Sequence, residues 1–227
     1  MENPLLNILF PRFCIGCGYV GTYVCPRCES QMKKTKGPYC FYCNKPSLLG
    51  FTHEKCKEKY GVDGCLSFYL YGGLFKTVIQ TAKYKGAYEV LRSLLTQYPQ
   101  PRIKTIYTWN TLFKPTLASV PLHPQRMRER GFNQSDLITQ CFFNDPNFIK
   151  SLLLSRKINT EHLANMGSKR IRKKHIKDSF AFIGKTIPKT VLLIDDVITS
   201  GSTILECSKT LKKNGVQTVL AFSLAKG

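Results

Sequence analysis

Eight residues near the start of the chain are spaced as metal ligands. Three CxxC pairs and one HxxC pair follow one another within 43 residues: Cys14, Cys17, Cys25, Cys28, Cys40, Cys43, His53 and Cys56. Zinc binds four thiolate or imidazole ligands in a tetrahedron, and a CxxC turn offers two of them to one metal. We predict two structural zinc ions, with the pairs used in sequence order. Interleaved pairing of the four pairs is the alternative.

The other three cysteines follow no ligand spacing. Cys207 shares an apolar helical face with Ile204 and Leu211, and we expect it, like Cys65 and Cys141, to be a buried thiol. Ten cysteines used in this way are typical of a reducing compartment, where disulfides are rare. We therefore expect a cytoplasmic protein.

A second candidate site lies in the stretch VLLIDDVITSGST, residues 191–203. Its apolar start predicts a buried strand that ends at Asp195 and Asp196, so that both acids lie at the carboxyl edge of a sheet. Small and hydroxylated residues then lead into a helix, which suits a phosphate: Thr199, Ser200, Gly201, Ser202 and Thr203. Carboxylates accept hydrogen bonds from sugar hydroxyls, and Mg²⁺ bridging sugar and pyrophosphate oxygens would reduce the repulsion.

The remaining pattern places these residues in an α/β fold. Apolar runs predict strands over residues 65–71, 116–121, 190–195 and 216–225, and helical spacing predicts helices over 75–84, 88–98, 134–143 and 202–213. Strands that alternate with helices indicate a parallel sheet flanked by helices. The cysteine-rich part has few aliphatic residues, so we predict two domains, 1–62 and 63–227.

The charge of the chain points to a polyanionic partner. Lys and Arg number 34 against 14 Asp and Glu, a formal net charge of +20. Residues 156–177 are the most basic part, and the predicted nucleic-acid contacts there are Lys169, Arg170, Arg172, Lys173 and Lys174. Tyr84, Tyr88, Phe41 and Tyr42 are candidates for stacking on single-stranded bases. No segment reaches the roughly 18 consecutive apolar residues of a membrane span, so we do not expect a transmembrane protein.

The stretch VLLIDDVITSGST resembles the fingerprint of type I phosphoribosyltransferases: an apolar strand, two acids and a Thr-[Ser/Thr]-Gly-x-Thr loop. The cysteine-rich start is followed by two further stretches, YGGLFKTVIQTAKYKG at 71–86 and VPLHPQRMRERGFNQSDLI at 120–138. Together they resemble the ComF family, bacterial proteins associated with DNA uptake in natural transformation. The resemblance implies a type I phosphoribosyltransferase-like sheet carrying a small N-terminal double zinc ribbon.

The same resemblance implies roles for individual residues. Asp195 and Asp196 would contact the ribose hydroxyls of phosphoribosyl pyrophosphate, and Thr199 to Thr203 its 5′-phosphate. The pyrophosphate would lie near the turn after the second strand, where the candidates are Pro121, Leu122, His123, Arg126, Arg128 and Arg130. Lys83 and Lys85 are further candidate cations. In such a transfer pyrophosphate leaves through an oxocarbenium-like state, so these groups would act by electrostatic stabilisation.

Three functions fit these residues. The first is a protein that handles incoming single-stranded DNA and has a pocket for phosphoribosyl pyrophosphate or a related nucleotide. The second is an active phosphoribosyltransferase with a small acceptor that the sequence does not identify. The third is an interaction protein whose zinc ribbons dock a helicase-like or membrane partner, such as a protein of the DNA-uptake machinery, and whose pocket only senses a nucleotide.

Overall fold

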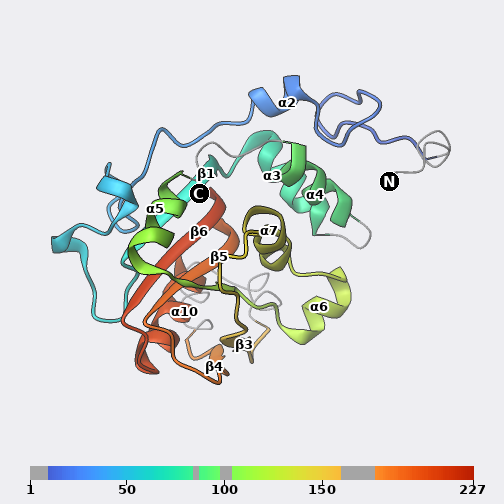
Figure 1. The fold of residues 1–227 in the computed structure, drawn as a ribbon. Coiled ribbons are helices and arrows are strands. Elements are labelled where there is room, and N and C mark those ends of the chain that lie inside the picture. Colours follow the sequence, from blue (N-terminus) through green and yellow to red (C-terminus); the bar gives the residue numbers. More distant parts are fainter. Residues whose placement is uncertain (1–9, 84–86, 98–103, 160–176) are drawn as a thin grey trace.

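The computed structural model describes residues 10–83, 87–97, 104–159 and 177–227. Within them lies a four-stranded sheet with the order β1 (Gly64–Leu70), β6 (Thr218–Lys226), β5 (Thr190–Ile198) and β2 (Thr116–Ser119). All three strand pairs are parallel. Helices cover both faces of the sheet (Figure 1). The α/β class and the parallel sheet flanked by helices, both predicted from the sequence, are confirmed.

The central strand β5 is buried on both of its faces, which explains its unbroken apolar run. Leu192 and Ile194 pack into the hydrophobic cluster on one face of the sheet, and Val191 and Leu193 into the cluster on the other. All four side chains are fully buried. Such strands are typical of parallel sheets between two helical layers.

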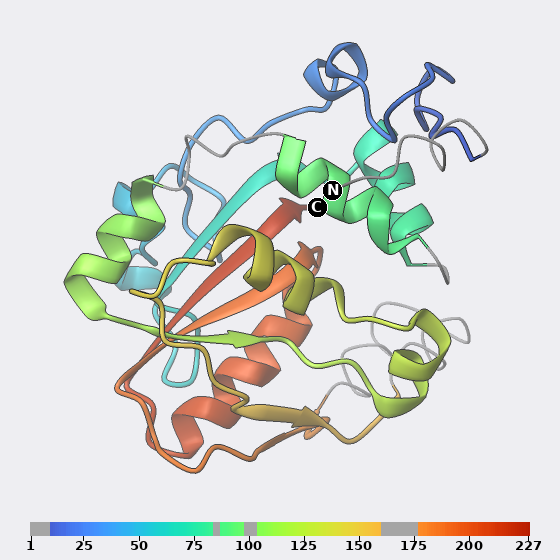
Figure 2. The same ribbon diagram turned by 45° about the vertical axis from the view of Figure 1, so that its right-hand side comes forward.

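The two helical layers follow from the same alternation. On one face lie α3 (Gly73–Ala82), α4 (Tyr88–Gln97) and α7 (Gln134–Phe142), and on the other lies α10 (Ser202–Lys213), as Figure 2 shows. Phe222 of β6 is the aromatic centre of the first layer, with ring contacts to residues of β1, α7 and the segment after α7.

Some elements were not expected from the sequence. The helix α5 (Lys104–Phe113) is rich in β-branched and aromatic residues, which favour strands, but burial of Ile106 and Trp109 outweighs that preference. The Arg-rich stretch forms a short helix, α6 (Pro124–Arg130). The strands β3 (Leu154–Arg156) and β4 (Phe180–Phe182) pair with each other in a separate antiparallel sheet.

The cysteine-rich part runs along the domain that contains the sheet and contains little regular structure: α2 (Pro26–Ser30), η1 (Leu48–Gly50) and η2 (Glu54–Cys56). Its first half packs on α3 and α4, where the side chain of Gln97 donates to Thr22 at 3.0 Å. Its second half lies beside β1 and the C-terminal strand (Figure 1). The division into two domains at residue 62 stays a prediction. Among the described residues, no helix combines the length and apolarity needed to span a bilayer.

Candidate functional site: a pocket at the carboxyl edge of the sheet

The strand β5 extends further than its sequence suggested. The predicted strand ends at Asp195, whereas in the structure Asp195 pairs with Ser223 and the ladder continues to Ile198 opposite Lys226. Pairing with β6 holds these extra residues in the sheet. On its other side β5 loses its neighbour, because β2 stops at Ser119 opposite Ile194. The two acids therefore lie where one edge of β5 is open.

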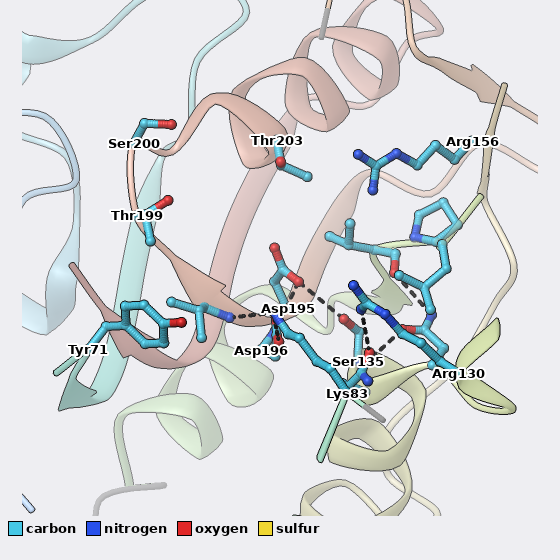
Figure 3. Close-up of a pocket in the computed structure, with 16 residues that line it drawn as sticks. Tyr71, Lys83, Arg130, Ser135, Arg156, Asp195, Asp196, Thr199, Ser200 and Thr203 are labelled. Carbon is cyan, nitrogen blue, oxygen red and sulfur yellow. Dashed lines mark hydrogen bonds and ion pairs between the residues drawn. The ribbon is translucent and has the colours of Figure 1, made fainter. Parts of the chain in front are cut away.

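A cavity of about 260 Å³ occupies this open edge (Figure 3). After β2 the chain leads to α7 on one face of the sheet, and after β5 it leads to α10 on the other. Adjacent parallel strands whose helices leave on opposite faces open a crevice between their carboxyl ends, and α/β proteins bind ligands in such crevices. The cavity is lined by Tyr71, Lys83, Val120, Pro121, Leu122, Arg130, Asn133, Gln134, Ser135, Arg156, Asp195, Asp196, Val197, Thr199, Ser200 and Thr203.

Asp195 is the more constrained of the two acids. Its Oδ1 accepts hydrogen bonds from Ser135 Oγ at 3.2 Å and from the Asp196 amide at 2.9 Å. Burial, and next the charge of Asp196, raise the pKa of Asp195 to about 8. Near neutral pH this carboxyl group retains its proton in much of the population, so it can both donate and accept hydrogen bonds to a ligand hydroxyl.

Asp196 presents one oxygen to the cavity. Its Oδ1 accepts from the Val197 amide at 2.8 Å, and its buried Oδ2 lies 3.3 Å from the Lys83 ammonium without a hydrogen bond. Gln134 is in a similar position: its Oε1 accepts from Arg130 at 3.1 Å, while its buried Nε2 has no hydrogen-bond partner among the described residues. An acceptor and a donor therefore remain available in the lining of one cavity, and buried polar atoms of this kind require a partner.

The loop after β5 lines the opposite side of the cavity. Thr199, Ser200 and Thr203 line it, whereas Gly201 and Ser202 do not. Gly201 has φ +72° and is the N-cap of α10, so the loop turns sharply into the helix. Exposed hydroxyls beside a helix N-terminus are suited to an anion.

The predicted cations separate into two groups. Arg130 lines the cavity, as do Pro121 and Leu122. His123 instead caps α6 by accepting from the Gln125 amide at 3.3 Å. Arg126 pairs with Glu129 in a neighbouring cleft, and Arg128 lies exposed on α6.

Several lining residues were not assigned from the sequence. Arg156 was counted only as part of the basic stretch, but its guanidinium group extends into the cavity (Figure 3). The stretch Gly131–Ser135 was noted only as a family motif. Gly131, with φ +81°, ends α6, and Asn133 Oδ1 accepts from the Ser135 amide to begin α7. The helix start at residue 134 was predicted from the sequence, and the left-handed glycine and Asn cap before it are a recognisable turn signal, but no local signal placed Gln134 and Ser135 in the pocket.

The predicted nucleic-acid residues Lys169, Arg170, Arg172, Lys173 and Lys174 lie outside the described residues, as do Tyr84 and Lys85. Tyr88, a candidate for base stacking, packs edge-on against Phe132 at 5.2 Å. Phe41 and Tyr42 also make edge-on contact with each other, at 5.1 Å. All three residues are half-buried, and each ring packs edge-on against another ring.

The eight metal-ligand candidates gather into two groups in sequence order. They are Cys14, Cys17, Cys25 and Cys28 in the first cluster, and Cys40, Cys43, His53 and Cys56 in the second. Within each cluster the ligand atoms lie within 4.8 Å of one another, and two sulfurs of the first, those of Cys17 and Cys25, are 3.6 Å apart. Bonds of about 2.3 Å to one zinc ion would place tetrahedral sulfurs about 3.8 Å apart. Both clusters therefore fit structural zinc.

The electrostatics of the first cluster agree with a cation at its centre. Burial raises the pKa of Cys14, but hydrogen bonds from the backbone amides of Cys25, Cys17 and Gly16 outweigh it and bring the pKa to about 6. For Cys28, burial and the neighbouring sulfurs raise the pKa to about 12. One thiolate therefore opposes ionisation of the next, and a divalent ion would relieve that repulsion.

His53 in the second cluster is oriented as a ligand. Its Nδ1 lies 3.3 Å from the sulfur of Cys43, and its Nε2 lies 3.1 Å from the Pro46 carbonyl oxygen. If Nε2 carries the proton and donates to that carbonyl, the lone pair of Nδ1 is directed at the cluster. Metal-binding histidines are commonly fixed in this way by a carbonyl on the other ring nitrogen. Cys65, Cys141 and Cys207 lie outside both clusters; Cys65 and Cys207 are buried and Cys141 is half-buried.

Comparison with known proteins agrees with this arrangement. The model of the double zinc ribbon domain matches residues 5–59. The chain is 27% identical to competence protein F of Haemophilus influenzae, over 89% of this chain and 90% of that protein. It is 28% identical to competence protein ComFC of Streptococcus pneumoniae, over 89% and 87%. It is 32% identical to the DNA utilization protein YhgH of Escherichia coli K12, over 48% of each chain.

The similarity to these competence proteins extends over about nine-tenths of the chain. With its double zinc ribbon and these relatives, the chain belongs to the ComF family.

Proposed function

We propose that this protein binds phosphoribosyl pyrophosphate, or a related nucleotide, in the pocket and handles single-stranded DNA during DNA uptake. The observation that carries the pocket proposal is the meeting of three kinds of group in one cavity. Two acids lie at the end of β5, and the hydroxyl groups of the next loop lie beside the start of α10. The cations are Lys83, directly after α3, Arg130 of α6 and Arg156 of β3.

In this proposal each group meets the part of the ligand that its chemistry suits. Asp195 and Asp196 bind the ribose hydroxyls, and the Oδ2 of Asp196 accepts one of them in addition to its ion pair with Lys83. Thr199, Ser200 and Thr203 surround the 5′-phosphate. Arg130 and Arg156 neutralise the pyrophosphate together with Mg²⁺, which would bridge ribose and pyrophosphate oxygens.

The DNA part of the proposal rests on charge and on relatives. A single small ligand does not account for a net charge of +20, whereas a polynucleotide backbone does. The relatives are named as competence proteins and as a DNA utilization protein. We therefore propose that the protein acts in DNA uptake and that single-stranded DNA binds to the basic stretch that contains Arg172, Lys173 and Lys174.

One calorimetric experiment tests both parts. The zinc-loaded protein is titrated with phosphoribosyl pyrophosphate and Mg²⁺, and then with a single-stranded oligonucleotide. We expect saturable binding of each. Changing Asp195→Asn together with Asp196→Asn should abolish the first binding step and preserve the second. A wild-type protein that gives no heat with phosphoribosyl pyrophosphate, and no thermal stabilisation by it, would refute the pocket proposal.

Charge reversal separates the DNA part from a general effect of charge. Changing Arg172, Lys173 and Lys174 to Glu should weaken oligonucleotide binding and reduce its salt dependence by about two units of log–log slope. The matched control reverses three exposed lysines elsewhere, Lys185, Lys189 and Lys213, with the same change in net charge. Equal loss in both triple variants would exclude the basic stretch as the binding segment.

A second function, phosphoribosyl transfer to a small acceptor, is favoured by one observation. A cleft of about 580 Å³ adjoins the pocket and shares Lys83 and Arg130 with it. Thr77, Gln80 and Thr81 of α3 give this cleft hydrogen-bonding groups for an acceptor. Release of pyrophosphate on adding a base or amine, lost in the double aspartate variant, would establish it.

A further inference from the structure

The ring of Phe41 lies directly against the phosphate loop, which we define as residues 199–203. A Cβ atom added to Gly201 would stand 2.5 Å from the Cζ of Phe41 and 3.3 Å from two more of its ring carbons. Gly201 also has φ +72°, where a side chain is strained even without the ring. The tip of the aromatic ring therefore faces the backbone of the loop at a distance that only glycine permits.

This ring belongs to the second cysteine cluster. Phe41 stands between two predicted ligands, directly after Cys40, which is fully buried. Its neighbour Tyr42 makes edge-on contact with it and accepts a hydrogen bond from the Val62 amide at 3.1 Å. The CxxC turn therefore fixes the direction of Phe41, and a zinc ion on Cys40 and Cys43 would fix the turn.

The phosphate loop lies between the pocket and the second cluster. Thr199 and Ser200 line the pocket, and they also line a small cavity of about 170 Å³ together with Tyr39, Phe41 and Tyr42. Both residues are exposed, and the side-chain hydrogen bonds of the loop with the rest of the described chain are confined to those between Ser200 and Ser202. The support for this loop therefore comes from the cluster side.

We propose that Phe41 is a positioning residue through which the second cysteine cluster holds the phosphate loop in its ligand-binding conformation. For affinity the inference rests on the proposed function, but the ordering of the loop is a property of the free protein. A loop held in place before the ligand arrives loses less conformational freedom on binding, which increases affinity. Without the ring, the loop would have to be ordered by the ligand.

The first cluster supplies a matched control. Ile15 follows Cys14 as Phe41 follows Cys40, and it too lies between the cysteines of a CxxC pair. Ile15 packs against the hydrophobic cluster of the α3, α4 and α7 face, on the other side of the molecule from α10. Its removal should affect packing and leave the phosphate loop unchanged.

The test compares Phe41→Ala with Ile15→Ala in full-length, zinc-loaded protein without ligand. Hydrogen exchange is measured for the Leu205 amide, which donates to the Gly201 carbonyl at 2.9 Å and reports on the loop and the helix start. We expect at least 10-fold faster exchange in Phe41→Ala and no change at this amide in Ile15→Ala. Affinity for phosphoribosyl pyrophosphate should fall about 10-fold in Phe41→Ala alone.

Each outcome decides one of the two proposals. Unchanged exchange at Leu205 in Phe41→Ala, with two zinc ions still bound, overturns the positioning role whether or not the ligand binds. Absence of ligand binding in the wild type overturns the proposed function and leaves the exchange result valid. If Phe41→Ala does not fold, Phe41→Leu, which retains apolar volume without a flat ring, takes its place. We expect it to give faster exchange at Leu205 than wild type.

Discussion

The two cysteine clusters share their ligand chemistry but differ in what they contact. In the first cluster three of the four ligands are buried, and Cys14, Cys25 and Cys28 form part of the hydrophobic core with α3 and α4. In the second cluster only Cys40 is buried. The residues beside Cys40, which are Tyr39, Phe41 and Tyr42, line a small cavity together with the end of β6 and the phosphate loop. The same motif thus packs into the hydrophobic core at one place and, in our proposal, supports the phosphate loop at the other.

The largest difference is expected on removing one ligand from each cluster. Cys28→Ser should lower the free energy of unfolding by more than about 3 kcal/mol, because the metal that is lost also holds buried core residues. Cys43→Ser should cost less stability and weaken binding of phosphoribosyl pyrophosphate more. Thermal unfolding, zinc content and calorimetry measure these effects. Equal stability losses with equal affinities would contradict the division between the clusters.

A substitution at Gly201, the loop residue that faces Phe41, tests the contact between the second cluster and the loop. Gly201→Ala places a methyl group where the ring lies and an Ala at φ +72°, and we expect a loss of about 2 kcal/mol together with weaker ligand binding. Adding Phe41→Ala should recover the part that is due to the clash but not the backbone strain. A double-mutant cycle on stability measures the coupling between the two positions, which purely additive losses would disprove.

The prediction for the pocket concerns Asp195, which belongs to neither cysteine cluster. The folded-state pKa of Asp195, about 8, lies above its ordinary value of 3.8, so its contribution to stability is fully present below about pH 4 and is lost as pH rises through 8. Asp195→Asn removes this loss. We expect the variant to gain stability relative to the wild type as pH rises from 5 to 8, by up to about 4 kcal/mol at about 1.4 kcal/mol per pH unit.

Chemical denaturation at several pH values measures that gain. Ile15→Ala in the same series is the control, because it changes no titratable group and lies outside the pocket. A stability difference between Asp195→Asn and wild type that does not change with pH would show that the Asp195 carboxyl group is ionised throughout this range.

The smallest effects on stability and affinity are expected from removing the hydroxyl group of Tyr69 or of Tyr42. Tyr69 donates at 3.0 Å to Glu29, which directly follows Cys28 of the first cluster, and Tyr42, which lies between Cys40 and Cys43 of the second cluster, accepts from the Val62 amide. Removing either hydroxyl group by substitution with Phe should cost about 1 kcal/mol. Only Tyr42→Phe should also change the affinity for phosphoribosyl pyrophosphate, because Tyr42 packs against Phe41. An affinity change in Tyr69→Phe of similar size would weaken the distinction.

Local patterns were sufficient for much of the fold. The helices predicted over 88–98 and 202–213 occur as Tyr88–Gln97 and Ser202–Lys213, because their apolar spacing matches the faces they bury. The helix Lys104–Phe113 was missed because its residues favour strands, and only burial of Ile106 and Trp109 explains it. The end of β5 was placed too early because the ladder with β6, which extends to Ile198, depends on residues far away in the chain.

Some residues of the candidate site could be selected from the sequence, and others could be found only in the structure. The phosphate loop and the paired acids are contiguous in sequence, so their spacing identified them. Lys83, Arg156 and Gln134 come from three separate elements, and their presence in one cavity depends on strand order and helix packing.

Residue types and their spacing were enough to select the candidates: eight residues spaced as metal ligands, an acidic pair before a phosphate-type loop, and a strongly basic chain. Residue type and short spacing carry that information, because a CxxC turn and a loop at a helix start are local structures. Only the tertiary structure decided which residues meet. Phe41 and Gly201 are 160 residues apart in the chain. They are in contact because the C-terminal strands bring the phosphate loop next to the second cluster.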